Sequence, residues 1–275
     1  MDEKSYSPEE IASLSKKRSE NESPKRFVLS REKFLTNRLE AVKAEVADMQ
    51  KKFPEVLSFC MFGSMVKGMA HEGSDIDGYL YIDSAQVAKG EGISEEQVLE
   101  NSVTLNQTYL TQEVAKKYIL EFRAGVRERT GLEDKDVEHI RSRPISEKVI
   151  DMEIARLLAF YKAREEYDAK VKGWADSRPP RGSSVDDLVA YEKARPIYPS
   201  YVAPSLGDMF HLDVGGGVKK YRKIFIERLN ELGPSGEKIW EDTIRSAEMI
   251  ENNLSTAPNK RYPRTLVAAR AVYAS

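Results

Sequence analysis

One short segment of the chain contains the residues best suited to chemistry, and its first part could hold phosphate groups. The apolar run over residues 56–62 predicts a buried strand, and Gly63 and Ser64 follow it directly. Glycine lets a ligand approach the backbone closely, and the free N–H groups at the start of a helix attract an anion. Ser64 adds a hydroxyl donor and Lys67 a positive charge one turn later. We therefore expect Gly63, Ser64 and Lys67 to bind phosphates.

The second part of the segment could bind a metal ion. Asp75 and Asp77 stand at the start of a second predicted strand, residues 76–82. Side chains alternate along a strand, so two acids separated by one residue point the same way. Two carboxylates held that close repel each other unless a cation lies between them, and their oxygen atoms suit Mg²⁺ or Mn²⁺. Phosphates beside a divalent metal are the requirements of phosphoryl or nucleotidyl transfer.

The surrounding pattern predicts the elements that position these residues. A helical spacing of apolar residues over 34–49 precedes the two strands, a longer helix covers residues 114–126, and residues 136–145 predict a third strand. After Ser146 the period becomes mostly helical. We expect a small unit of helices and strands followed by a helical region.

Composition divides the chain into three parts. Residues 1–26 are polar and contain few large apolar side chains, so we expect a mobile segment there. A change of period near residue 146 divides the rest into domains over 27–146 and 147–275. Within the second domain, the proline-rich stretch 174–205 predicts an irregular crossing with a short helix that begins after Ser184.

The chemical segment resembles the nucleotidyltransferase superfamily of DNA polymerase beta. Its sequence motif is most similar to that of the minimal nucleotidyltransferases and the aminoglycoside-modifying enzymes. The residues that match in order and spacing are Gly63, Ser64, Gly68, Ala70, Ser74, Asp75, Ile76 and Asp77. The resemblance covers residues 56–83 well and extends loosely to about residue 146. It implies an α+β fold in which a small mixed-sheet catalytic domain is followed by a helical domain.

The resemblance also implies a reaction and a set of roles. The hydroxyl of an acceptor attacks the α-phosphorus of a nucleoside triphosphate, and pyrophosphate leaves. Asp75 and Asp77 would bind Mg²⁺ or Mn²⁺ and act as catalytic residues, and Ser74 would join the nucleotide-binding residues. The family carries a third carboxylate on a later strand. Glu138 is the preferred candidate, as a metal ligand and catalytic residue, because Val137 and Ile140 bracket it; Asp136 is the alternative.

The partners follow from the same resemblance and from the charge of the chain. The nucleotide is an NTP, with ATP expected. A small hydroxylated acceptor is favoured over a protein side chain and over an RNA 3′ end, because the formal net charge of −2 offers no strong basic excess for nucleic acid. The rival interpretation is a non-catalytic member of the fold that binds a nucleotide or a partner protein.

Composition excludes several other classes. Cys60 is the single cysteine, so neither an intramolecular disulfide nor a cysteine-built zinc site can form. The sequence contains no apolar run of the roughly 18 to 20 residues that a membrane span needs, and its start lacks the pattern of a secretory signal. We expect a cytoplasmic protein without a membrane partner.

Overall fold

The computed structural model describes residues 24–66, 73–102, 107–202 and 204–251. The segment predicted to be mobile, residues 1–26, lies outside them except for 24–26, which begin the first described helix. The helices are α2 (Pro24–Lys52), α3 (Gly63–Val66), α4 (Ser84–Glu91), α5 (Glu95–Val98), α6 (Gln112–Thr130), α7 (Asp134–Val137), α8 (Glu147–Asp176), α9 (Val185–Lys193), the 3-10 helix η1 (Ser205–Phe210), α10 (Lys219–Glu231) and α11 (Pro234–Glu251). The strands are β1 (Val56–Phe62), β2 (Asp77–Asp83), β3 (Leu99–Ser102), β4 (Gln107–Leu110), β5 (Ile140–Ile145) and β6 (Leu212–Val214).

Four of these strands form a small mixed sheet in the order β5-β2-β1-β6. Strand β1 pairs antiparallel with both β2 and β6, whereas β2 and β5 run parallel. Strands β3 and β4 form a separate antiparallel pair. The predicted α+β fold, in which a small mixed sheet is followed by a mostly helical region, is confirmed.

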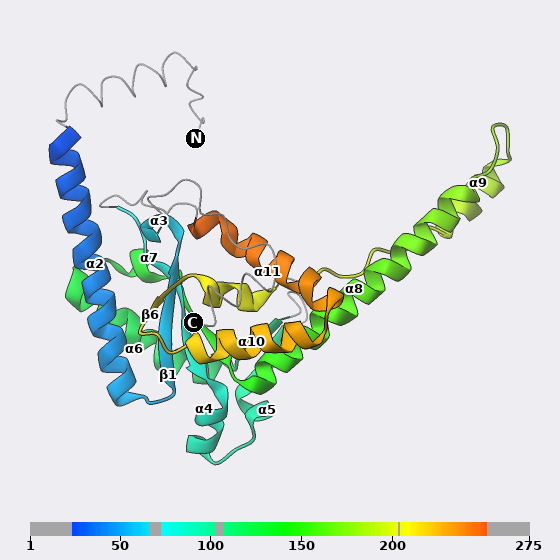
Figure 1. The fold of residues 1–275 in the computed structure, drawn as a ribbon. Coiled ribbons are helices and arrows are strands. Elements are labelled where there is room, and N and C mark those ends of the chain that lie inside the picture. The colour runs from blue at the N-terminus through cyan, green and yellow to red at the C-terminus, as the bar shows by residue number, and fades with distance from the viewer. Residues whose placement is uncertain (1–23, 67–72, 103–106, 203, 252–275) are drawn as a thin grey trace.

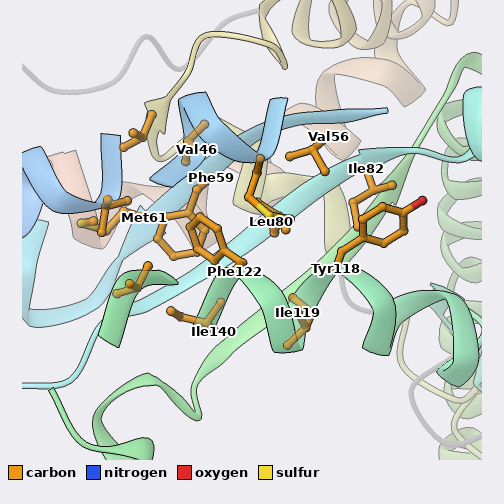
Figure 2. Packing of buried hydrophobic residues seen from close by; sticks show 14 of the residues in the cluster. Val46, Val56, Phe59, Met61, Leu80, Ile82, Tyr118, Ile119, Phe122 and Ile140 are labelled. Carbon is orange, nitrogen blue, oxygen red and sulfur yellow. The ribbon is translucent and has the colours of Figure 1, made fainter. Parts of the chain in front are cut away.

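Helices α2 and α6 cover one face of the sheet, and Figure 2 shows the apolar cluster between them. Alternate residues of the two central strands, among them Phe59 and Leu80, enter this cluster because successive side chains of a strand face opposite sides. The ring of Phe59 packs against that of Phe122 of α6, with centroids 5.1 Å apart. A slip of one residue would turn these side chains away from the helices, so their burial fixes the register.

The chain after residue 146 covers the opposite face of the sheet. Cys60 of β1 and Tyr81 of β2 belong to an apolar cluster that includes residues of α8, η1, α10 and α11. Within it, Phe210 packs edge-on against Trp240, with ring centroids 5.2 Å apart. The same part of the chain also supplies strand β6, which extends the sheet beside β1 (Figure 1). The division into domains over 27–146 and 147–275 stays a prediction.

Helix α8 projects from the body as an arm whose far end carries α9 (Figure 1). Its buried residues all lie in its first half, between Val149 and Tyr161. Farther out, Trp174 stacks on Tyr191 of α9 with ring centroids 4.5 Å apart, and its Nε1 donates to the Tyr191 carbonyl at 2.8 Å. The short helix expected after Ser184 is present, because Ser184 caps α9. Although α8 has 30 residues, neither it nor another described helix is apolar enough to cross a membrane.

The third strand of the catalytic region begins later than its apolar pattern predicts. We expected a strand over 136–145, but β5 begins at Ile140 and the helical turn α7 precedes it. A capping box explains the difference: Glu133 caps the turn, and the Asp136 carboxylate accepts a hydrogen bond from the Glu133 N–H at 3.0 Å. This local bonding holds residues 134–137 in a helical conformation before the sheet pairing starts.

Candidate active site

The turn between β1 and α3 holds a carboxylate directly against its glycine. Gly63 has a φ of +74°, and β1 and β2 pair so that Phe62 lies opposite Asp77. A Cβ atom on Gly63 would lie only 2.0 Å from Oδ2 of Asp77. Because only glycine leaves room for this contact, the backbone turn predicted to hold phosphates and one carboxylate of the predicted metal pair share one place in the fold.

The loop that carries the two aspartates is anchored from both sides. Ile76 is fully buried, and its N–H donates to the carbonyl of Asp136 at 2.8 Å. Arg38 of α2, which is buried, donates to the carbonyl of Ser74. With Ile76 pointing into the core, Asp75 and Asp77 stay half-buried on the outer side of the loop. Their carboxylates are therefore held in place and remain within reach of solvent.

The two carboxylates and an imidazole meet at this loop. Ligand atoms of Asp75, Asp77 and His139 all lie within 4.8 Å of one another. His139 immediately precedes β5, and its Nε2 lies 3.6 Å from Oδ2 of Asp75. Two carboxylate oxygens and one imidazole nitrogen form a donor set that fits a divalent metal ion. The residues present thus suit the metal that the resemblance implies.

The two alternatives for the third acid, Glu138 and Asp136, lie outside the three-ligand group. Glu138 follows α7, its side chain is 62% exposed, and its Oε1 lies 3.7 Å from Nε2 of His139, so it lies next to the three-ligand group without belonging to it. Asp136 is engaged in the capping box of α7. The catalytic role of Glu138 stays a prediction. His139 was not predicted as a ligand, because the resemblance implies a carboxylate at this place; the only sequence signal was its position directly after Glu138, the preferred candidate.

The remaining predicted residues lie at or beyond the edge of the described site. Ser74 is a buried residue of the loop, and its predicted contact with nucleotide stays a prediction. Lys67 lies outside the described residues. Ser64 belongs to α3, directly after Gly63, where its backbone continues the turn.

A polar and aromatic layer lies next to Asp77 on the same face of the sheet. Tyr79 is two residues farther along β2, and the Arg143 guanidinium stacks on its ring at 4.2 Å from the centroid. The same guanidinium pairs with Asp208 of η1 at 3.0 Å. Burial acts to lower the pKa of Arg143, but the charge of Asp208 and the nearby tyrosines outweigh it and raise that pKa. Arg143 therefore stays charged and ties the sheet to η1.

Comparison with known families identifies the region around this site. Residues 41–150 match the family model of the nucleotidyltransferase domain. This range runs from within α2 to the start of α8 and includes Gly63, both aspartates and His139. Comparisons with curated proteins and with solved structures find no match.

Proposed function

Residues 41–150 form a nucleotidyltransferase domain of the DNA polymerase beta superfamily, and from this premise we propose that the protein moves a nucleoside monophosphate from ATP to a hydroxyl group of a small molecule. The reaction depends on a divalent metal ion, Mg²⁺ or Mn²⁺, and releases pyrophosphate. The family of this domain consists of transferases of phosphorus-containing groups. The nucleotide, the metal and the acceptor are the parts that we propose.

One observation carries the proposal: the carboxylate of Asp77 lies against the backbone of Gly63. A phosphate chain that rests on this turn would have its oxygens next to the aspartate pair. Asp75 and Asp77 would hold the metal ion at this place. When bound, such an ion neutralises phosphate charge and lowers the pKa of an attacking hydroxyl.

The chain's own residues have positioning as their main task. Gly63 and Ser64, with Lys67 in support, would hold the β- and γ-phosphates, while Asp75 and Asp77 would hold the metal ion. Arg38 and Ile76 keep the aspartate loop in place, through the hydrogen bonds at Ser74 and Asp136 described above. Transfer reactions of this kind draw most of their acceleration from orientation and from preorganised charge.

The acceptor is proposed from the layer beside the aspartates. Tyr79 lies about 7 Å beyond Asp77 along the strand, since two residues of a strand span this distance. Its ring contacts the guanidinium of Arg143, which pairs with Asp208. The side chain of Asp208 is 24% exposed. An aromatic ring with a carboxylate suits a small polar molecule that carries hydroxyl or amino groups. The net charge of −2 supports this acceptor over an RNA end.

The test follows labelled nucleotide into product. The purified protein is incubated with each α-³²P-labelled NTP, Mg²⁺ or Mn²⁺, and a cell extract separated into small-molecule, protein and RNA fractions. We expect label from ATP to enter the small-molecule fraction, and the Asp75→Ala/Asp77→Ala double variant to lose this transfer by at least about 100-fold. Glu138→Gln, a change at the neighbouring acid, shows whether that carboxylate also takes part.

Each outcome assigns the acceptor or rejects the proposal. Label in the protein or RNA fraction would replace the small-molecule acceptor with a side chain or an RNA end. Metal-dependent binding of NTP without transfer to a component of any fraction would favour the non-catalytic alternative. Transfer that survives in the double variant would contradict the roles of Asp75 and Asp77.

A further inference from the structure

We propose that His139 is the third ligand of the metal ion held by Asp75 and Asp77, and that its imidazole makes the site select Mn²⁺ over Mg²⁺. The inference rests on the proposed function, because it names the metal of the same site. It replaces the third carboxylate, for which the resemblance suggested Glu138, with a nitrogen ligand.

The distance between His139 and Asp75 fits two ligands of one ion. Their atoms, Nε2 and Oδ2, are 3.6 Å apart, which is too long for a good hydrogen bond. An ion with bonds of about 2.1 Å holds its neighbouring ligand atoms about 3 Å apart and its opposite ones about 4 Å apart. The observed separation lies between these values. Small rotations of these three partly accessible side chains would bring all three ligand atoms to bonding distance.

The backbone around His139 is fixed before an ion binds. Arg123 of α6 donates through Nη2 to the carbonyls of Glu138 and Ile140, at 2.5 Å each, and through Nε to Ile140 at 3.1 Å. These two carbonyls flank His139 on either side. One guanidinium thus holds the residues that precede and follow the proposed ligand, which is the support that metal ligands need from their surroundings.

The sheet brings this clamped residue to the aspartate loop. Strands β2 and β5 run parallel with Gly78 beside Ile140, so Asp77, the first residue of β2, and His139, the residue before β5, meet at the same end. The hydrogen bond from Ile76 to the carbonyl of Asp136 ties the two segments together. The loop that carries the two aspartates and the segment that carries His139 are therefore connected to each other.

The chemistry of the donor set gives the preference for manganese. Mg²⁺ takes oxygen ligands almost exclusively and demands near-ideal octahedral geometry. Imidazole suits softer divalent ions, and Mn²⁺ accepts carboxylate oxygens as well. Compared with a site of three carboxylates, a site with two aspartates and a histidine therefore binds Mn²⁺ with little loss of affinity. The same change lowers its affinity for Mg²⁺ much more.

The test measures binding of the metal alone to the full-length protein, without nucleotide. Mn²⁺ and Mg²⁺ affinities are determined by isothermal titration calorimetry, and electron spin echo modulation of bound Mn²⁺ reports whether a nitrogen nucleus is coordinated. We expect wild type to bind Mn²⁺ more tightly and to show nitrogen modulation. His139→Ala should lose the modulation and weaken Mn²⁺ binding at least about tenfold. Loss of a residue that only supports a metal ligand already weakens metal binding by about this factor.

Two further variants complete the design. His139→Glu restores an oxygen ligand and should lower the ratio of Mn²⁺ to Mg²⁺ affinity, again without nitrogen modulation. Glu128→Gln, a change at an exposed acid of α6, should leave both affinities and the modulation unchanged. A circular dichroism spectrum of each variant confirms that it has folded.

The outcomes separate this inference from the proposed function. Mn²⁺ binding that requires Asp75 and Asp77 but shows no nitrogen signal, or an unchanged affinity in His139→Ala, would overturn the role of His139 and leave the two aspartates as the site. Mn²⁺ binding that survives in the Asp75→Ala/Asp77→Ala variant would contradict both.

Discussion

Replacement of Gly63 by alanine tests the contact on which the site depends. The new Cβ would lie 2.0 Å from Oδ2, 2.8 Å from Cγ and 2.9 Å from Cβ of Asp77, so the aspartate must rotate away or its strand must shift. The φ of +74° adds a backbone cost of about 1 to 2 kcal/mol for a residue with a side chain. That cost lowers the melting temperature by a few degrees in a chain of this size. The displaced carboxylate should lower the transfer rate at least about 100-fold, as misplacement by about 1 Å can do.

Gly131 offers a matched control for the backbone effect. It ends α6 with a φ of +69°, and an added Cβ would meet nothing within 4 Å. Gly131→Ala should therefore carry the backbone cost without the clash, lower the free energy of unfolding by no more than Gly63→Ala does, and leave transfer unchanged. The assay compares thermal melting, Mn²⁺ affinity and the initial rate of label transfer for the two variants. Equal activity in both variants, or an equal loss in both, would show that the contact between Gly63 and Asp77 is not what positions the carboxylate for transfer.

Three further predictions concern the surroundings of the site. Asp208→Asn leaves the buried charge of Arg143 without its partner and should lower the free energy of unfolding by about 3 kcal/mol in urea titrations; a loss below about 1 kcal/mol would contradict this. Burial and the hydrogen bond to Asp83 raise the pKa of Tyr221, so the unfolded chain loses the phenol proton at a lower pH than the folded chain does. Stability therefore falls as the pH rises above about 10. Tyr221→Phe should make the melting temperature fall less steeply in that range. Trp174→Ala removes the stacked pair that joins α8 to α9 and should speed proteolysis of the arm while Mn²⁺ affinity stays the same; an unchanged cleavage rate would show that the stack does not hold the arm.

The sequence was most informative where function and local structure obey the same rule. A glycine after β1 and two acids around the start of β2 are each required by short-range chemistry, so their spacing predicted strands and a turn, and the motif that contains them carried the resemblance to a family. The structure adds what spacing cannot give, which is the contact between Gly63 and Asp77. That contact depends on the register of β1 against β2.

The third ligand was harder to predict because it depends on where a strand begins. Residues 136–140 combine a pattern suitable for a strand with the capping box of α7, and the local hydrogen bonds of the box prevail up to Val137. The start of β5 at Ile140 then places His139 beside the aspartates. Sequence alone does not decide between these two local structures, so the choice among residues 136, 138 and 139 needed the structure.

Long-range pairing was also beyond the sequence. Strand β6 has three residues, Leu212–Val214, too few for a period to be visible, and it joins the sheet beside β1 from about 150 residues away. Its partners are set by the packing of η1 and α10 on the sheet. Phe225 and Trp240 are buried in the apolar cluster on this face of the sheet. The sequence pattern predicts only that each lies on the apolar face of a helix, not what that face packs against.

Two labels on the same nucleotide show most directly which group the protein transfers. The protein is given ATP labelled with ³²P at the α-position or at the γ-position, with Mn²⁺ and the small-molecule fraction as acceptor. Transfer of a nucleoside monophosphate predicts that the α-label enters the product and the γ-label leaves as pyrophosphate, both at rates that Asp77→Ala abolishes. Entry of the γ-label into the product would mean transfer of a phosphoryl group and would contradict the account.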